Sequence, residues 1–233
     1  MKARRSMSGG PSVILFVRSP ERGKVKSRLA AAIGKEMALE VYKGFVLDII
    51  ETLKKGHYPF RLFFYPRSSE GRVVKWLGKD FVYFPQEGSD IGKRMENAFI
   101  QSFSMGSEKV VLIGSDIPDL PNSVIDRAFS SLYKSDAVVG PASDGGYYLI
   151  GFKTTSFLPD IFHGIHWSTS SVCQETMAIF RHFQLRVHVL RQWNDVDTFD
   201  DLRTLFKRNQ HTDFRVSRSM SLCKRIFQVT HYE

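Results

Sequence analysis

Short apolar runs alternate with helix-periodic segments along most of this chain, and no other feature constrains the fold as strongly. The runs Val13–Val17, Phe60–Tyr65 and Val110–Ile113 are rich in β-branched or aromatic residues, which favours buried strands. Between the first two, apolar side chains recur at helical spacing over residues 35–55, until Gly56. Because strands that alternate with helices connect by right-handed crossovers, the chain is predicted to form an α/β domain around a mainly parallel sheet.

The remaining elements follow from the same periodicities. Further strands are expected at 81–84, at 136–140, after the turn at 144–146 and at 185–190. Further helices are expected at 73–77, after Asp90, at 124–132, at 172–183 and after Thr198. Beyond residue 206 the periodicity fades, and a helix is expected near 222–229.

The net charge of +9 is concentrated in residues 1–10, 11–28 and 207–233, so the rest of the chain is nearly neutral. We therefore divide the chain into a basic tail over residues 1–11, a domain over 12–206 and a basic appendage over 207–233. Basic ends are usually solvated, and they attract polyanions weakly. A nucleotide- or polyanion-binding module without catalysis is thus one alternative, although no specific nucleic-acid partner is expected.

Nothing in the sequence predicts a membrane span or a secretion signal. No apolar run approaches the roughly 20 residues that cross a bilayer, and the basic start is not followed by an apolar segment of sufficient length. The two cysteines, Cys173 and Cys223, lack metal-ligand spacing. A reduced, cytoplasmic protein is the expectation.

The stretch Lys109–Leu120 joins a predicted buried strand to a stiff acidic loop. Asp116 follows the strand closely, and Pro118 stiffens the loop because its φ is fixed. Ligands bind at the carboxyl ends of strands in open parallel sheets, and an ionised carboxylate there suits a hard divalent cation. The structural alternative is that Asp116 closes a turn and Asp119 caps the next helix.

Residues 18–29 are predicted to form a basic loop after the first strand, since Pro20 and Gly23 disfavour a helix. Lysine and arginine around a glycine are expected of a phosphate cradle. The patterns GxxxxGK[ST] and GxGxxG are both absent, and a solvated basic loop is the alternative. The candidate nucleotide or phosphate contacts are Arg18, Gly23, Lys26 and Arg28.

Three further segments carry candidate site residues. Asp90 fits the N-cap of a helix, although the loop before it is also placed to meet a nucleotide. The sequence Asp144-Gly145-Gly146 predicts a tight turn, in which glycines also permit close approach of a ligand. Tyr147 and Tyr148 should point to opposite faces of the strand that follows.

Two loops that precede helices complete the set. The ring of Trp167 is suited to stack on a sugar or base, or to cover the core, and one of Ser168, Thr169 and Ser170 should cap the next helix. Thr198 should cap the following helix. Capping does not explain the two carboxylates before that cap, Asp195 and Asp197.

Five segments in this order resemble one known family: RSPERGKVKSRL, GSDIPDL, GPASDGGYYLIG, WST and DVDTFDDL. The chain is similar to glycosyltransferases of the nucleotide-diphospho-sugar transferase superfamily, of the type named for arsenosugar biosynthesis or as selenodomain-associated. The resemblance covers residues 13 to about 206. It implies a single Rossmann-like GT-A domain, a three-layer sandwich with a central, mostly parallel mixed sheet. It also implies a nucleotide-activated sugar as donor, a small-molecule acceptor and magnesium or manganese as cofactor.

The resemblance assigns roles to matching residues. Asp116 and Asp197 would hold the metal, and the basic loop with Gly23, Lys26 and Arg28 would hold the phosphates. The turn at Asp144–Gly146 corresponds to the sugar or acceptor side of the cleft. His166 and Phe199 stand where the family pattern has proline, which affects the acceptor side more than the metal side.

The residue patterns and the resemblance agree on a site at the carboxyl edge of the sheet. Asp116 and the pair Asp195 and Asp197 would flank one cation, and Asp144 is the candidate general base. A nucleotidyltransferase that joins a nucleoside triphosphate to a small phosphorylated acceptor fits the basic loop equally well. The sequence specifies neither the base, the acceptor nor the oligomeric state.

Overall fold

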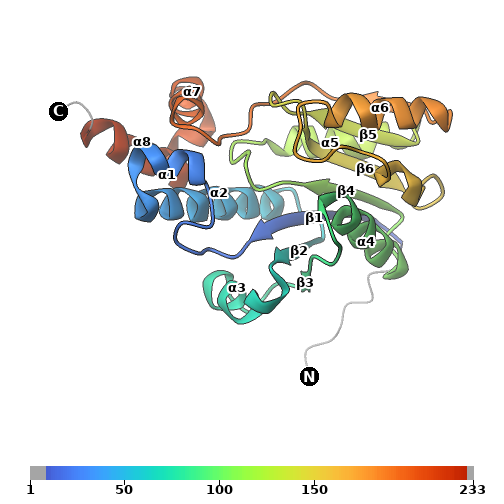
Figure 1. Ribbon diagram of the computed structural model, residues 1–233, viewed down its shortest axis with the longest axis horizontal. Helices are drawn as coiled ribbons and strands as arrows, with labels where there is room; N and C mark the ends of the chain where they lie inside the picture. Colours follow the sequence, from blue (N-terminus) through green and yellow to red (C-terminus); the bar gives the residue numbers. More distant parts are fainter. Residues whose placement is uncertain (1–8, 230–233) are drawn as a thin grey trace.

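The computed structural model describes residues 9–229, and a single seven-stranded sheet forms its centre (Figure 1). The strand order is β3-β2-β1-β4-β6-β5-β7. Strand β6 runs antiparallel to β4 and β5, and every other neighbouring pair is parallel. The predicted α/β fold with a mostly parallel mixed sheet is therefore confirmed. Residues 1–8 of the predicted basic tail lie outside the described residues.

The strands are β1 (Pro11–Arg18), β2 (Phe60–Tyr65), β3 (Tyr83–Pro85), β4 (Lys109–Ile113), β5 (Ala137–Pro141), β6 (Tyr147–Lys153) and β7 (Val187–Val189). The α-helices are α1 (Ser27–Ile33), α2 (Lys35–Lys55), α3 (Glu70–Leu77), α4 (Ile91–Ser104), α5 (Asn122–Ser131), α6 (Val172–His182), α7 (Phe199–Asn209) and α8 (Arg218–Val229). Three short 3₁₀ turns are η1 (Arg67–Ser69), η2 (Pro159–Phe162) and η3 (Asp213–Val216).

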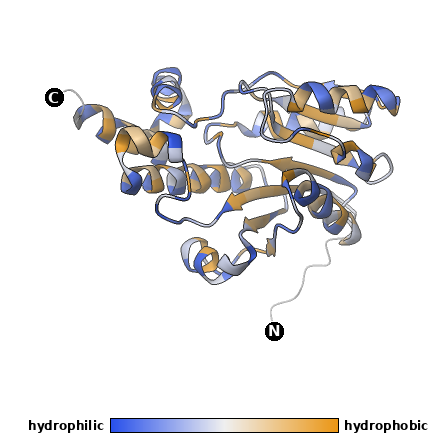
Figure 2. Ribbon diagram, in the orientation of Figure 1, coloured by the Kyte–Doolittle hydropathy of each residue, from blue (hydrophilic) through white to orange (hydrophobic). Residues whose placement is uncertain are grey.

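Helices cover both faces of the sheet, which gives three layers. One face packs against α2, α3 and α5, with Tyr42 and Ile125 among the buried side chains. The other face packs against α4, η2 and α6, around Phe99 and Phe180. Figure 2 shows the apolar residues gathered along the strands and on the inward sides of the helices. Burial on both faces explains why the central strands are almost wholly apolar.

A third apolar cluster lies on the outer side of α2, where α1, α7 and α8 gather (Figure 1). Leu29, Phe45, Leu202 and Cys223 are buried in this cluster. Helix α8 begins at Arg218, earlier than the sequence periodicity predicted. Part of the basic appendage therefore packs against the domain, and the division at residue 206 stays a prediction.

Local signals predicted several elements closely. Helix α2 and strand β2 have the predicted bounds. The loop predicted over residues 18–29 is wrong at its end, because α1 begins at Ser27. Pro20 and Gly23 break the chain only as far as Lys26, after which Leu29 anchors a short helix in the third cluster. None of the described helices is long and apolar enough to cross a membrane.

The cap predicted for α6 at residues 168–170 is also wrong. Ser171 is the N-cap residue, and its side chain makes no capping hydrogen bond. The backbone N–H of Cys173 in the first turn instead donates to the carbonyl oxygen of Gly145, at 2.8 Å. The carbonyl oxygen of Gly145, in the loop before β6, therefore accepts a hydrogen bond that a serine or threonine side chain accepts in other helices.

Candidate active site

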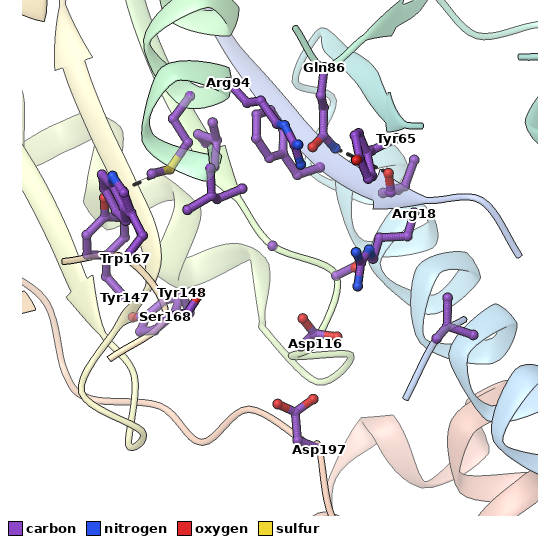
Figure 3. Close-up of a pocket in the computed structure, with 18 of the residues that line it drawn as sticks. Arg18, Tyr65, Gln86, Arg94, Asp116, Tyr147, Tyr148, Trp167, Ser168 and Asp197 are labelled. Carbon is purple, nitrogen blue, oxygen red and sulfur yellow. Dashed lines mark hydrogen bonds between the residues drawn. The ribbon is translucent and has the colours of Figure 1, made fainter. Parts of the chain in front are cut away.

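A cleft of about 820 Å³ opens beside the carboxyl ends of β1 and β4. Arg18, Tyr65 and Gln86 lie on one wall, where β1, β2 and β3 end, as Figure 3 shows. Tyr147, Tyr148 and Trp167 lie on the opposite wall. The predicted site residues that line the cleft are Arg18, Lys26, Arg28, Asp90, Asp116, Asp144, Tyr147, Trp167 and Asp197.

The two acidic loops meet at the floor of this cleft. The backbone N–H of Val196 donates to the carbonyl oxygen of Asp116, at 2.9 Å, and Val196 is fully buried. The side chains of Asp116 and Asp197 are 48% and 40% exposed, so both reach solvent in the cleft. Their convergence is the arrangement that the sequence predicted for two loops at one edge of a parallel sheet.

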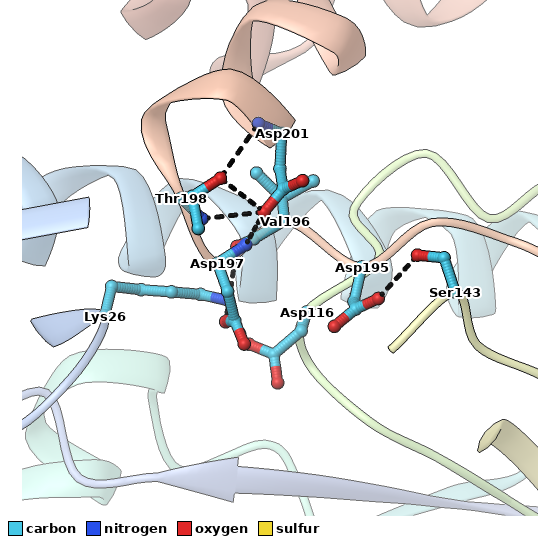
Figure 4. Close-up of polar contacts among 8 residues, drawn as sticks. All are labelled: Lys26, Asp116, Ser143, Asp195, Val196, Asp197, Thr198 and Asp201. Carbon is cyan, nitrogen blue, oxygen red and sulfur yellow. Dashed lines mark hydrogen bonds and ion pairs between the residues drawn. The ribbon is translucent and has the colours of Figure 1, made fainter. Parts of the chain in front are cut away.

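The ammonium group of Lys26 lies between these carboxylates (Figure 4). Its Nζ atom forms an ion pair with Asp116 and lies 2.9 Å from Oδ1 of Asp197 and 2.6 Å from the carbonyl oxygen of Val196. The side chain is only 3% exposed. Burial alone would lower the pKa of Lys26, but the charges of Asp116 and Asp197 outweigh burial, and the pKa is raised above its usual value.

The backbone at Lys26 is held in a left-handed conformation, with φ of 48° and ψ of 48°. This conformation costs a non-glycine residue on the order of 1 kcal/mol, so surrounding contacts must stabilise it. The carbonyl oxygen of Lys26 accepts a hydrogen bond from Ala30 at 2.8 Å, which begins α1. The backbone therefore directs this lysine towards the carboxylates, whereas Arg28 in the first turn of α1 is exposed and lines the cleft.

A capping box holds Asp197 at the start of α7. Oγ1 of Thr198 accepts from the N–H of Asp201 at 3.2 Å, and Oδ2 of Asp201 accepts from the N–H groups of Thr198 and Asp197, at 2.8 and 3.1 Å. The predicted cap at Thr198 is therefore confirmed. Because Asp201 satisfies these backbone donors, the carboxylate of Asp197 takes no part in the cap and faces Lys26 and the cleft.

Asp195 and Asp144 lie to one side of this pair. Oδ1 of Asp195 accepts a hydrogen bond from Oγ of Ser143, at 3.2 Å, and Asp195 is not among the residues that line the cleft. Burial and the nearby charge of Asp144 raise the pKa of Asp195. Asp144 is exposed, and its Oδ1 accepts from the N–H of Gly146 at 2.8 Å, which closes the predicted turn.

The predicted glycines do not line the cleft. Gly23 adopts φ of +75° in the basic loop. Gly145 adopts φ of +92°, and a Cβ atom there would lie 2.0 Å from the carbonyl oxygen of Ser170. Only glycine permits this approach between the turn at 144–146 and the loop before α6. Gly145 thus positions the wall that carries Trp167, while Gly146 donates to the turn itself.

Asp90 and Trp167 meet at the start of α4. Asp90 is the N-cap, and its Oδ1 accepts from the N–H of Lys93 at 2.9 Å, so the capping interpretation is confirmed. The indole of Trp167 lies directly over Gly92, where a Cβ atom would come within 2.3 Å of the ring. The ring packs at the edge of the core, which was one of the two alternatives, and it also faces the cleft, where stacking on a sugar or base stays a prediction.

Sequence reasoning missed the polar wall near β2 and β3. The guanidinium of Arg94 lies 3.8 Å from the centre of the Tyr65 ring, which suits a cation–π contact. Nε2 of Gln86 donates to the carbonyl oxygens of Val17 and Phe63, at 3.2 and 2.8 Å, and ties the ends of β1 and β2 together. The one available signal was Arg94, which lies one helical turn after the predicted cap at Asp90.

The carboxylates fit a divalent cation that is shared with a substrate. Among residues 9–229, no group of three or more histidine, cysteine, aspartate or glutamate side chains is close enough to hold a metal ion alone. Magnesium is commonly bound by one or two carboxylates together with substrate phosphates. Asp116 and Asp197 already converge on one cationic group, so their donor set suits such an ion.

Comparison with known proteins identifies the family. A family described as "Uncharacterized protein conserved in bacteria (DUF2064)" matches residues 49–169, which is more than half of the chain. The chain belongs to the DUF2064 family. A crystal structure from Desulfovibrio desulfuricans G20, named a "putative nucleotide-diphospho-sugar transferase", has a TM-score of 0.92 and 38% identity over 95% of this chain and 97% of that chain. The DUF2064 match and this neighbour support the nucleotide-diphospho-sugar transferase superfamily, which the sequence resemblance indicated.

More distant structures share the fold of this DUF2064 protein. The inositol-1-phosphate CTP transferase of T. maritima has a TM-score of 0.55 at 15% identity, over 91% of this chain and 96% of that chain. A manganese complex of Rv0371c from Mycobacterium tuberculosis H37Rv has a TM-score of 0.51 at 16% identity, over 86% of this chain and 100% of that chain. No curated protein matches the sequence. The Desulfovibrio desulfuricans neighbour, which is named a transferase, bears out the prediction of an enzyme.

Proposed function

We propose that this DUF2064 protein is a metal-dependent transferase that uses a nucleotide-activated sugar as donor. The observation that carries the proposal is the convergence of Asp116 and Asp197 on Lys26 at the floor of a large polar cleft. The name of the Desulfovibrio desulfuricans neighbour supports the donor class. The order of the five sequence motifs supports the arsenosugar or selenodomain-associated type.

In this proposal the basic side chains hold the nucleotide phosphates. Arg18, Lys26 and Arg28 line the cleft beside the carboxylates, and Arg94 adds a cation on the wall with Tyr65. Cations attract the phosphate oxygens and fix the donor before reaction. Gly23 contributes the turn of the basic loop rather than a direct contact.

Asp116 and Asp197 would hold a magnesium or manganese ion, with Asp195 close behind them as a further acidic group. A divalent cation, when bound, supplies charge stabilisation for the diphosphate that departs. The manganese complex of Rv0371c supports this choice of cofactor at the level of a shared fold.

The opposite wall is proposed to bind the sugar or the acceptor. Tyr147 and Trp167 offer aromatic surface to a sugar ring, and the turn at 144–146 borders the same wall. Asp144 is exposed at the rim, and we propose it as the general base that accepts a proton from the acceptor.

A nucleotidyltransferase is the second candidate, because the inositol-1-phosphate CTP transferase shares the fold and the cleft holds several cations. The released product separates the two candidates. Glycosyl transfer releases a nucleoside diphosphate, whereas nucleotidyl transfer releases pyrophosphate. The test incubates the protein and manganese with a panel of sugar nucleotides, then of nucleoside triphosphates, with sugar and sugar-phosphate acceptors, and assays both products.

The variant Asp116→Asn tests the role of the site. The amide of asparagine is a weaker ligand for the cation that stabilises the departing diphosphate, so turnover should fall by roughly 100-fold. Asp213→Asn, at an exposed acid in η3, is the matched control and should keep wild-type turnover. Full activity of Asp116→Asn would contradict the proposed role. If Asp116→Asn binds nucleotide as tightly as the wild type does, and neither of these two proteins shows turnover, a binding module is favoured instead.

A further inference from the structure

We infer that Lys26 closes the two-carboxylate site against a free divalent cation and opens it only when a nucleotide phosphate binds. The inference rests on the proposed function, which it deepens by specifying that metal and nucleotide bind together. Its basis is the set of contacts that the ammonium group makes in the protein alone.

The ammonium group of Lys26 already has a full set of partners. An ammonium has three protons to donate, and three oxygens lie in contact with Nζ: one from Asp116, one from Asp197 and the carbonyl oxygen of Val196. The ring of Phe45 lies below, with its centre 5.5 Å from Nζ. Lys26 therefore neutralises one of the two carboxylate charges that would attract a metal ion.

A free cation meets a specific obstacle at this site. To use Asp116 and Asp197, it must separate both from Lys26, whose side chain is only 3% exposed. A buried ammonium that loses its anions without replacement is strongly disfavoured. Free metal binding should therefore be weak, although the carboxylates themselves are suitable ligands.

A nucleotide phosphate removes this obstacle, because it offers Lys26 a replacement anion. Lys26 lines the cleft where the phosphates are proposed to bind, between Arg18 and Arg28 in sequence. When the ammonium turns to the phosphate, the two carboxylates become available to the cation that accompanies the nucleotide. By linkage, nucleotide should then raise metal affinity by the same factor as metal raises nucleotide affinity.

The first experiment measures binding of Mn²⁺ alone, from the free-ion electron paramagnetic resonance signal. Lys26→Met should bind Mn²⁺ roughly 10-fold more tightly than wild type, within the usual range of coupling between sites. The exposed Lys24 in the same loop gives the matched control, because Lys24→Met removes one charge without freeing the carboxylates. Lys24→Met should bind Mn²⁺ as weakly as wild type does.

The second experiment measures retention of CDP, UDP, GDP and ADP by equilibrium dialysis, with and without Mn²⁺. Wild type should retain its preferred nucleotide at least about 10-fold more tightly with Mn²⁺, and Lys26→Met should show a smaller dependence, because only the contacts between the shared cation and the phosphates then couple the two ligands. Lys26→Gln serves as a second neutral variant if the methionine variant does not fold, as judged by circular dichroism.

Two results would overturn the inference, and they differ in what they leave standing. If Lys26→Met binds Mn²⁺ no more tightly than Lys24→Met, while wild type binds Mn²⁺ with a nucleotide, Lys26 is not the barrier and the proposed function stands. If no protein binds Mn²⁺ with or without any of the nucleotides, metal dependence itself is wrong, and the proposed function falls with the inference.

Discussion

Asp119 and Arg208 form a bidentate ion pair that fastens the loop after β4 to helix α7. Nε of Arg208 lies 2.7 Å from Oδ2 of Asp119, and Nη2 lies 2.8 Å from Oδ1. Asn209 and Trp193 also donate to this carboxylate, at 2.7 and 3.1 Å, and Asp119 is only 3% exposed. Asp119 therefore does not cap α5, which was the alternative given from the sequence. Asp119 instead holds the loop that carries Asp116 against α7, the helix that follows Asp195 and Asp197.

The variant Asp119→Ala should be strongly destabilised. It leaves a guanidinium without its buried partner, which typically costs about 3–5 kcal/mol. Arg208→Met should behave similarly, and transfer activity should fall roughly 10- to 100-fold, because the two acidic loops that are proposed to hold the metal lose their common support. Urea unfolding and turnover at a temperature where the variant is folded would measure these effects.

The control for this prediction is the exposed ion pair of Glu40 and Lys43 on α2, with Nζ 2.8 Å from Oε1. Glu40→Gln should change the unfolding free energy by no more than about 0.5 kcal/mol. If Arg208→Met kept the stability and turnover of the wild type, the pair would not support the site.

Gly92→Ala should displace Trp167 from the wall of the cleft. A Cβ atom at position 92 would overlap the indole ring, at 2.3 Å, so the ring must move. Overpacking of this kind costs about 1–3 kcal/mol, and the tryptophan emission should shift as the ring becomes more exposed. If Trp167 binds the sugar or acceptor, the KM of that substrate should rise.

Gly71→Ala is the matched substitution, since Gly71 lies in α3 with no atom within 4 Å of a Cβ there. This variant should be stabilised by about 0.5–1 kcal/mol and should leave the emission unchanged. An unchanged spectrum and KM for Gly92→Ala would contradict the role given to Trp167.

Local signals made much of this fold predictable from sequence. Helix α2 has a continuous apolar periodicity, and Asp90 and Thr198 are strong N-cap residues, so each of these features is found where predicted. The edge of the sheet that carries Asp116 was also predictable, because a buried strand followed by a proline loop has few alternatives.

The contacts that complete the site depend on the folded chain and have no local signal. The partners of Lys26 at Val196 and Asp197 lie 170 and 171 residues away in sequence. No sequence pattern indicates the left-handed backbone that turns this lysine inward. Lys26 forms an ion pair with the carboxylates in the protein alone, and its contact with phosphate stays a prediction. Arg94 on α4 was missed because its partner Tyr65 lies at the end of β2, distant in the sequence.

Asp48→Ala should release helix α8 from α2. Oδ1 and Oδ2 of the buried Asp48 accept from the N–H groups of Arg218 and Ser219, at 3.1 and 2.8 Å. A side chain of α2 therefore caps the start of α8. Loss of a buried cap and its charge should cost about 2 kcal/mol or more. Thermal unfolding would measure the loss, with Lys224→Gln on the exposed side of α8 as the neutral control.

The same packing tests the predicted division of the chain at residue 206. Deletion of residues 207–233 removes Cys223 and Ile226 from the third apolar cluster and removes Arg208 and Asn209 from Asp119, so the shortened chain should melt at a lower temperature. A shortened chain with the wild-type melting temperature would instead establish residues 12–206 as an independent domain.

Asp136 should make stability depend on pH on the acid side. Its Oδ2 accepts from the backbone N–H of Arg186 at 3.0 Å, and its Oδ1 lies 3.3 Å from Nζ of Lys153. Burial alone would raise the pKa of Asp136, but these hydrogen bonds and charges outweigh it, so the pKa lies below the usual 3.8. The folded state therefore binds this proton less readily than the unfolded state does.

The stabilisation from Asp136 is consequently present above pH 3.8 and is lost as the pH falls through the lower pKa of the folded state. Asp136→Asn should be less stable than wild type by about 1 kcal/mol at pH 7, and this difference should narrow as the pH falls below 3.8. Urea midpoints between pH 7 and 3 measure this, with the exposed Asp213→Asn expected to follow wild type. A constant difference between Asp136→Asn and wild type across this range would mean that the paired carboxylate does not control acid stability, because only a group whose pKa differs between folded and unfolded states changes the slope.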